Sequence, residues 1–238
     1  MTTFILASVA PALFIMYLIY RHDIESEPLL MLLKAFFGGV LSIFISLLFS
    51  TPLSKLILSN SFISPMMEAF LAAAIPEEVS KWLIFVWFIK RSKHFDQYYD
   101  GILYAIFISM GFALIENLFY VFEGGLGVAI SRAIFAVPGH MLFAIPMGYF
   151  FSISRFEIKK DAFKHKWYSL LIPILLHGIY NSILMYINFN SENYIFILVL
   201  LFIFTYFQIK LWRYGLNKIR LHKELDLQKE IRYPNFSS

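Results

Sequence analysis

The stretch Ile75-Pro76-Glu77-Glu78-Val79-Ser80-Lys81-Trp82 places two adjacent carboxylates and a lysine inside a long apolar run, from about Met66 to Ile89. A charged side chain at the centre of a membrane helix costs roughly 2.5–3.5 kcal/mol on insertion scales. Three such residues so close together therefore need mutual pairing, water or a catalytic task. The rest of the chain is interpreted as the scaffold that accommodates this stretch.

The composition is that of an integral membrane protein. Of the 238 residues, 59% are hydrophobic and 15% are charged, whereas a soluble domain carries roughly 25% charged residues. Repeated apolar runs of about 20 residues predict membrane-spanning helices and an all-α fold. The absence of cysteine excludes disulfide and thiol chemistry. Basic loops at the membrane surface explain the net charge of +4, so we expect a lipid bilayer, and no nucleic acid, around this chain.

The apolar runs predict a polytopic helix bundle with about seven transmembrane helices. The predicted spans cover residues 3–20, 29–49, 65–89, 99–122, 127–152, 167–188 and 193–213. Lys and Arg gather after the third and fifth spans and in the tail. Because basic loops stay in the cytoplasm, we expect the C-terminus inside and the N-terminus outside. The predicted organisation is a membrane domain at 1–213 and a basic cytoplasmic tail at 214–238.

Polar residues inside the other spans are informative, because a helix in lipid satisfies its own backbone and needs no polar side chains. They are Glu116 and Asn117 in the fourth span, Arg132 and His140 in the fifth, and His177 and Asn181 in the sixth. At a rise of about 1.5 Å per residue, Glu77, His140, His177 and Asn181 lie at similar depth. We therefore expect these helices to converge on one site.

Helical spacing groups the polar side chains further. Glu77 and Glu78 precede Lys81 by four and three residues, so either carboxylate can pair with the lysine on one helix face. His177 and Asn181 are also four residues apart and face one direction. The pattern predicts two polar faces that meet inside the bundle.

Prolines interrupt the helices beside these residues. Pro76 directly precedes the glutamates, and Pro138 lies two residues before His140. A proline removes one helical hydrogen bond, and broken helix at membrane depth is typical of a cavity that holds water. Arg132, by contrast, lies near the outer interface, where we expect its side chain to snorkel.

No serine or cysteine lies in a recognisable nucleophile setting, so the carboxylates and histidines point to activated water. A glutamate buried beside a lysine suits a general base near neutral pH. His140 is placed to orient the same water. His177 and Asn181 are placed to donate hydrogen bonds to a developing oxyanion. This is a constellation for peptide hydrolysis without a covalent intermediate.

Five segments together resemble the PrsW family of intramembrane proteases, part of the wider group of CAAX-processing and bacteriocin-processing membrane proteases. They are Pro76-Glu-Glu-Val-Ser-Lys81-Trp82, Tyr99-Asp-Gly-Ile-Leu-Tyr104, Gly111-Phe-Ala-Leu-Ile-Glu-Asn117, the Arg132 to Pro138-Gly-His140 stretch, and Leu176-His-Gly-Ile-Tyr-Asn181. The resemblance covers nearly all the predicted spans. It implies a multi-pass protein of the bacterial cytoplasmic membrane that cleaves a single-pass anti-sigma factor during envelope or antimicrobial-peptide stress.

The resemblance also implies roles for residues of this chain. Glu77 corresponds to the base and Glu78 to its support, His140 to the residue that positions water, and His177 and Asn181 to the oxyanion site. Lys81, Glu116 and Asn117 are supporting residues, and the role of Glu116 is open between catalytic and architectural. No metal ion and no cofactor is expected.

Two alternatives stay open at the level of sequence. Glu and His side chains also bind zinc, which leaves a zinc-dependent membrane metalloprotease possible, although no His-Glu-x-x-His spacing is present. Ionisable groups at mid-membrane also suit a non-enzymatic proton-coupled transporter or a receptor.

Overall fold

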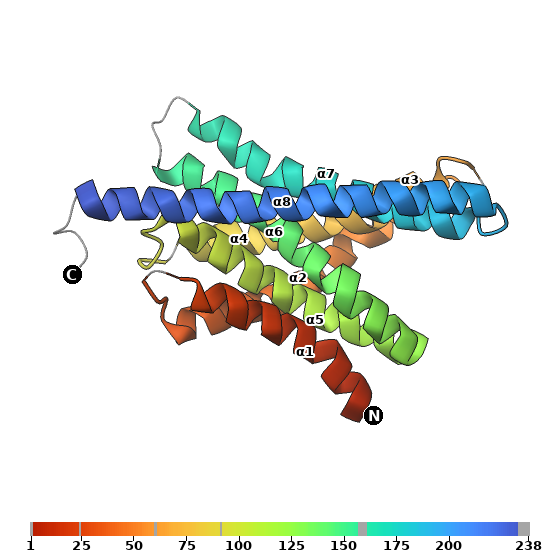
Figure 1. Ribbon diagram of the computed structural model, residues 1–238, viewed down its shortest axis with the longest axis horizontal. Coiled ribbons are helices and arrows are strands. Elements are labelled where there is room, and N and C mark those ends of the chain that lie inside the picture. The colour runs from red at the N-terminus through yellow and green to blue at the C-terminus, as the bar shows by residue number, and fades with distance from the viewer. Residues whose placement is uncertain (1, 24, 60, 91, 157–160, 233–238) are drawn as a thin grey trace.

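The computed structural model describes residues 2–23, 25–59, 61–90, 92–156 and 161–232. The described residues form helices joined by short connections, with no β-strand among them, which confirms the predicted all-α fold (Figure 1). The elements are α1 (Thr2–Arg21), α2 (Leu29–Ser54), α3 (Ser64–Met67), η1 (Glu68–Ala74), α4 (Ile75–Ile89), α5 (Tyr98–Ser131), η2 (Arg132–Ala136), α6 (Val137–Phe156), α7 (Ala162–Phe189) and α8 (Tyr194–Arg232), where η marks a π-helix.

Four helical stretches are long and apolar enough to cross a membrane. They cover Leu29–Ser54, Tyr98–Phe156, Ala162–Phe189 and Tyr194–Lys229, and a shorter apolar helix covers Ile5–Arg21. The longest stretch contains α5, η2 and α6, and Gly125, at φ 74°, interrupts it. Only glycine adopts such a backbone conformation freely, so Gly125 allows the kink in this stretch. The count of seven spans and the orientation of the termini stay predictions.

The C-terminal segment, predicted as a basic tail, is helical as far as Arg232. α8 continues without a break past residue 213 as far as Arg232. Its Asp226 side chain accepts hydrogen bonds from the backbone N–H groups of Tyr98 (2.7 Å) and Tyr99 (2.8 Å) at the start of α5. Those N–H groups have no partner within α5, so Asp226 satisfies them. The division at residue 213 stays a prediction, and residues 233–238, like Lys159 and Lys160 of the basic loop, lie outside the described residues.

Small residues let α5 lie at the centre of the bundle. A Cβ atom on Gly39 of α2 would lie 1.8 Å from the carbonyl oxygen of Ile108. A Cβ atom on Gly111 of α5 would lie 2.0 Å from the carbonyl oxygen of Phe36. A Cβ atom on Gly148 of α6 would lie 2.1 Å from the carbonyl oxygen of Gly101. Close backbone contact through small residues is the usual way in which membrane helices pack. The α2–α5 and α5–α6 crossings are therefore fixed by glycine.

Two π-turns, η1 and η2, precede the helices that carry the site. The Ile75 N–H bonds to the Phe70 carbonyl, and the Val137 N–H bonds to the Arg132 carbonyl, five residues earlier in each case. Pro76 and Pro138 follow directly and have no N–H with which to continue the regular pattern. Proline therefore accounts for both irregular turns, which are frequent at functional sites.

Candidate active site

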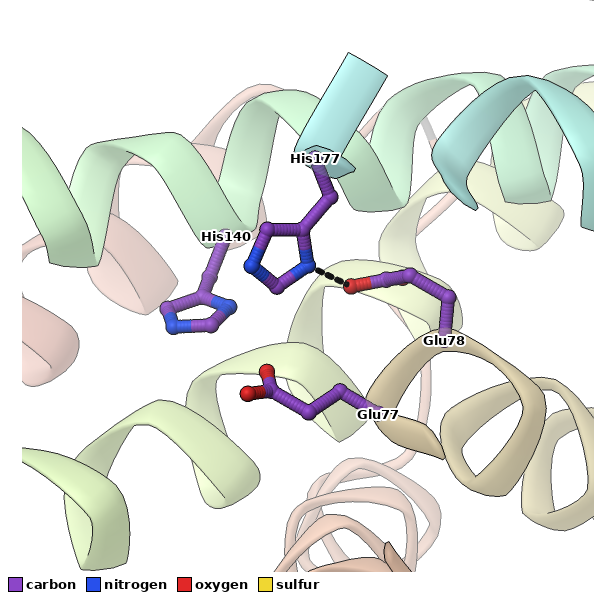
Figure 2. Close-up of side chains that lie close together, drawn as sticks. All are labelled: Glu77, Glu78, His140 and His177. Atoms are coloured by element: carbon purple, nitrogen blue, oxygen red, sulfur yellow. Dashed lines mark hydrogen bonds and ion pairs between the residues drawn. The ribbon is translucent and has the colours of Figure 1, made fainter. Parts of the chain in front are cut away.

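The predicted catalytic side chains meet in the interior of the bundle. Glu77 and Glu78 come from α4, His140 from α6 and His177 from α7 (Figure 2). One ligand-type atom of each lies within 4.8 Å of those of the others, and all four residues are buried. In Figure 2 the Glu77 carboxylate points toward the two imidazole rings, as the predicted convergence at one depth requires.

Lys81 lies at the centre of this cluster. Its Nζ atom is 2.8 Å from Glu78 Oε1, 3.2 Å from His140 Nδ1 and 3.4 Å from Glu77 Oε2. An ammonium group has three protons, and each faces one of these acceptors. Nζ also lies 4.1 Å from the centre of the Phe112 ring, a cation–π contact. Lys81 therefore binds three members of the site at once, which is more than the neutralisation of one glutamate that its spacing predicted.

Glu78 is tied to α7 through His177. Its Oε1 atom lies 2.9 Å from His177 Nδ1, and His177 Nε2 lies 3.1 Å from Asn181 Nδ2. The Phe143 ring stacks on the His177 ring at a centroid distance of 4.7 Å and an angle of 15°. The imidazole is thus fixed on both edges and on one face. Nothing in the sequence distinguished Phe143 from the many other phenylalanines.

A second arm of the network runs from His140 toward α1. Glu116 Oε2 accepts from His140 Nε2 at 2.8 Å and from Arg132 Nη2 at 2.6 Å. Arg132 Nε donates to Asn117 Oδ1 at 2.8 Å, and Asn117 Nδ2 donates to the Ser8 carbonyl oxygen at 2.9 Å. The expectation that Arg132 snorkels to the interface is therefore wrong. Depth alone suggested snorkelling, whereas the π-turn at its position directs Arg132 to the partly buried carboxylate of Glu116.

A cavity of about 300 Å³ opens beside this network. His140, His177 and Asn181 form part of its wall, whereas Glu77 and Glu78 are not among its lining residues. The cavity lies where α5, η2 and α6 face α7, and it is wide enough for a side chain. Its other lining residues are Glu116, Tyr120, Arg132, Ala136, Phe143, Tyr180, Leu184, Met185 and Asn188.

The predicted site residues are thus not all equivalent. Glu77, Glu78, Lys81, His140 and His177 form one cluster. Asn181 and Glu116 each touch one histidine of that cluster, on opposite sides. Asn117 bonds to Arg132 and to the backbone of α1 and, within the described part of the chain, makes no hydrogen bond to the cluster itself. It anchors the network from outside.

Comparison with known proteins decides the family. The sequence model described as "PrsW family intramembrane metalloprotease" matches residues 27–207. The Protease PrsW of Geobacillus kaustophilus is 34% identical over 224 residues, which cover 94% of this chain and 93% of that protein. The chain belongs to the PrsW family. The same name is carried by an Oceanobacillus iheyensis protein, 35% identical over 224 residues (94% of this chain, 98% of the relative).

The Bacillus subtilis Protease PrsW is 31% identical over 230 residues, covering 96% of this chain and the whole of that protein. No solved structure matches the chain. As a PrsW-family chain with several apolar helices of spanning length, it is a multi-pass membrane protein of bacteria.

The description of the PrsW family includes a metal, so the fit of the cluster to a metal ion matters. Two carboxylates and two imidazoles are ligand types that zinc accepts. In this structure, however, the Lys81 ammonium occupies the position between them and is bound to Glu77, Glu78 and His140. An ion placed there would compete with Lys81 for the same atoms and would lie beside its positive charge. The arrangement therefore fits an ammonium group and not a resident metal ion.

Proposed function

We propose that the chain hydrolyses a peptide bond of a single-pass membrane protein by means of a water molecule activated by Glu77. Membership of the PrsW family supports peptidase activity over the transporter and receptor alternatives. For the substrate we propose an anti-sigma factor anchored by one helix. This substrate class follows from the family resemblance, and the steps below follow from the geometry of the chain's own residues.

The observation that carries the proposal is the unequal engagement of the two glutamates. Glu78 Oε1 is held by two partners, Lys81 at 2.8 Å and His177 at 2.9 Å. Glu77 has one long contact, at 3.4 Å from Lys81. Both partners of Glu78 bind the same oxygen, Oε1, and its Oε2 atom has no hydrogen-bond partner among the described residues. A carboxylate with one long contact can accept a proton from water, whereas one whose oxygen bridges two partners holds those neighbours in place. Glu77 therefore serves as the base and Glu78 as its support.

The spacing of the cluster suits one water molecule. A water that makes two hydrogen bonds of about 2.8 Å spans groups up to about 5 Å apart. Ligand-type atoms of Glu77, His140 and His177 lie within 4.8 Å of one another. Glu77 takes a proton from this water, His140 orients it when its Nδ1 atom bonds to the water in place of Lys81, and the resulting hydroxide attacks the substrate carbonyl. Glu77 then passes the proton to the leaving amine.

The oxyanion that forms needs hydrogen-bond donors beside the cavity. A carboxylate only accepts, so His177 Nδ1 donates to Glu78, and in neutral His177 the Nε2 atom accepts from Asn181. The second N–H of the Asn181 amide is then directed to the oxyanion. His177 adds a donor of its own when it carries a second proton. One such donor contributes about 10²–10³-fold in rate.

The charge balance of the network supports proton transfer. Three carboxylates, Glu77, Glu78 and Glu116, face two permanent cations, Lys81 and Arg132. Buried charges are stable when they are paired. One additional proton, on a carboxyl or an imidazole, balances the cluster. A site that holds one mobile proton in this way can act as an acid and as a base within one catalytic cycle.

The test is co-expression with a single-pass anti-sigma factor that carries a tag at each end. Glu77→Gln keeps the shape of the side chain and removes the base, so we expect cleavage to fall by at least about 10²-fold. The matched control is Glu123→Gln, at an exposed position, which should cleave like the wild type. Equal membrane abundance is checked by immunoblot. Equal cleavage by the Glu77→Gln and wild-type chains would refute Glu77 as the base, and no cleavage by the wild type would contradict the substrate.

A metalloprotease is the second candidate. The family description and the close approach of two glutamates and two histidines favour it, whereas the position of Lys81 opposes it. Chelation separates the two mechanisms.

A further inference from the structure

We infer that Arg132 is a positioning residue for the proposed hydrolysis and that it acts through Glu116 on His140. This inference rests on the proposed function, in which His140 orients the attacking water. Arg132 touches neither the base nor the water position. Among the described residues, it is linked to the cluster by the carboxylate that it shares with His140, and it also lines the cavity.

The contacts form a short relay. Arg132 Nη2 and His140 Nε2 both bond to the same oxygen, Glu116 Oε2, at 2.6 Å and 2.8 Å. Because the carboxylate accepts from Nε2, His140 presents Nδ1 to the cluster, where Lys81 Nζ lies 3.2 Å away. A carboxylate bonded to the outer nitrogen of a histidine fixes its tautomer and its ring orientation. Arg132 in turn fixes the position of that oxygen.

Arg132 is itself held on three sides. Its Nε donates to Asn117 Oδ1 at 2.8 Å, and Asn117 is anchored to the Ser8 carbonyl of α1. Its guanidinium carbon lies 4.1 Å from the centre of the Tyr120 ring. Side-chain exposures of 13% for Arg132 and 17% for Glu116 place the pair at the edge of the cavity. A rigid fork with two bonded nitrogens is specific to arginine, and lysine reproduces only one of the two bonds.

A purely structural ion pair would be expected to stabilise the fold without affecting turnover. The shared oxygen argues for more than this, because any movement of Glu116 is transmitted directly to His140. Without Arg132, Glu116 keeps a single partner and gains rotamer freedom. His140 then loses its orientation while its backbone stays fixed, because Ser109 Oγ donates to the His140 carbonyl at 2.9 Å. We therefore expect a loss of turnover and not of substrate binding.

The experiment uses the full chain reconstituted in liposomes with the tagged anti-sigma factor. The variants are Arg132→Gln, Arg132→Lys, Glu116→Gln and the Arg132→Gln/Glu116→Gln double variant. Arg155→Gln, at an exposed position on α6, is the matched control. We expect Arg132→Gln to lower kcat by about 10- to 100-fold with an unchanged KM, and Arg132→Lys to recover part of the loss. The double variant should be no slower than Glu116→Gln alone, because Glu116 is the residue that links Arg132 to His140.

Chemical rescue gives a readout that a structural role does not produce. Arg132→Ala leaves a gap that opens to the cavity, and millimolar guanidinium added to this variant should restore part of kcat. The same addition should not help Glu116→Gln, which lacks the carboxylate that guanidinium must orient. Rescue remains measurable even if Arg132→Gln folds poorly, because kcat is compared with and without guanidinium in the same Arg132→Ala protein.

The outcomes separate the two proposals. A wild-type kcat in Arg132→Gln, a raised KM with unchanged kcat, or additive losses in the double variant would each overturn the positioning role. Full cleavage by Glu77→Gln would overturn the proposed function itself. Loss of cleavage in Glu77→Gln together with normal turnover in the Arg132 variants would overturn only this inference.

Discussion

Pro76 and Pro138 occupy matching places in two helices that meet at the site. Each is the second residue of an α-helix that follows a π-turn, and each precedes a proposed catalytic residue, Glu77 or His140, by one or two positions. One added residue rotates all following side chains by about 100° relative to the preceding ones. The two turns therefore decide which side chains face the interior.

Replacing either proline by alanine restores an N–H group and favours a regular α-helix in place of the π-turn. We expect Pro76→Ala and Pro138→Ala to lose most cleavage while the melting temperature in detergent stays the same or rises. Pro146→Ala, in the regular part of α6, is the control and should stay active. Full cleavage by Pro76→Ala would show that the turn does not set the position of Glu77.

The ammonium of Lys81 should dominate the stability of the cluster. Lys81→Met leaves Glu77 and Glu78 buried without their cation, and removal of one partner from a buried pair costs about 3–5 kcal/mol. The free energy of unfolding, measured by denaturant titration in detergent, should fall accordingly. The Lys81→Met/Glu78→Gln double variant should recover part of the loss, and Lys93→Met, at an exposed position, should change nothing. An unchanged free energy in Lys81→Met would show that the glutamates are stabilised by other means.

Metal removal tests the conclusion drawn from the position of Lys81. We expect purified protein to contain much less than one equivalent of zinc by elemental analysis. Cleavage in liposomes should persist after dialysis against a strong chelator. One tightly held equivalent, together with activity that disappears on chelation and returns with zinc, would establish the metalloprotease instead.

Glycine at the α2–α5 crossing should be intolerant of any side chain. A Cβ atom at Gly111 would lie 2.0 Å from the Phe36 carbonyl oxygen, whereas at Gly127 it would meet nothing within 4 Å. Overpacking of this kind costs about 1–3 kcal/mol or more. Gly111→Ala should therefore lower the melting temperature clearly and Gly127→Ala should not. Equal melting temperatures for the two variants would contradict the close crossing.

Glu27 lies in the connection between α1 and α2 and should make stability depend on pH. Burial raises the pKa of Glu27 to about 7, with smaller contributions in the same direction from Asp23, Asp96 and Glu25, while the hydrogen bond from the Tyr104 hydroxyl lowers it. The folded state holds the Glu27 proton more tightly than the unfolded state does. The stability that Glu27 contributes to the fold is therefore fully present below pH 4.5 and is lost as the pH rises through about 7.

Glu27→Gln mimics the protonated form at every pH. As the pH rises from 5 to 8, the melting temperature of the wild type should therefore fall relative to that of Glu27→Gln. Glu192→Gln, at the exposed turn between α7 and α8, should follow the wild type. Parallel curves for the wild type and Glu27→Gln would show that Glu27 is not protonated in the fold.

Contacts set by spacing within one helix were predictable from the sequence. The pairing of Glu77 and Glu78 with Lys81 follows from three- and four-residue separations. The convergence of His140 and His177 with Glu77 follows from counting depth, because apolar spans of similar length fix the height of each residue. These arguments need no knowledge of how the helices are arranged.

Contacts that depend on helix rotation were not predictable. Depth placed Arg132 near the interface, but its direction depends on η2, and a π-turn has no clear signature beyond the following proline. The stacking of Phe143 on His177 depends on the α6–α7 crossing. The charges of the segment after residue 213 also gave no sign that Asp226 is buried against the start of α5.

The hydrogen bond from Asn117 to the Ser8 carbonyl has a consequence for protein engineering. The family match begins at residue 27, after α1 has ended. A recombinant fragment that starts there would retain every acidic and imidazole side chain of the cluster and still lack the carbonyl that holds Asn117. A recombinant form of this membrane protein should therefore begin before Ser8, and a fusion partner is best attached ahead of α1.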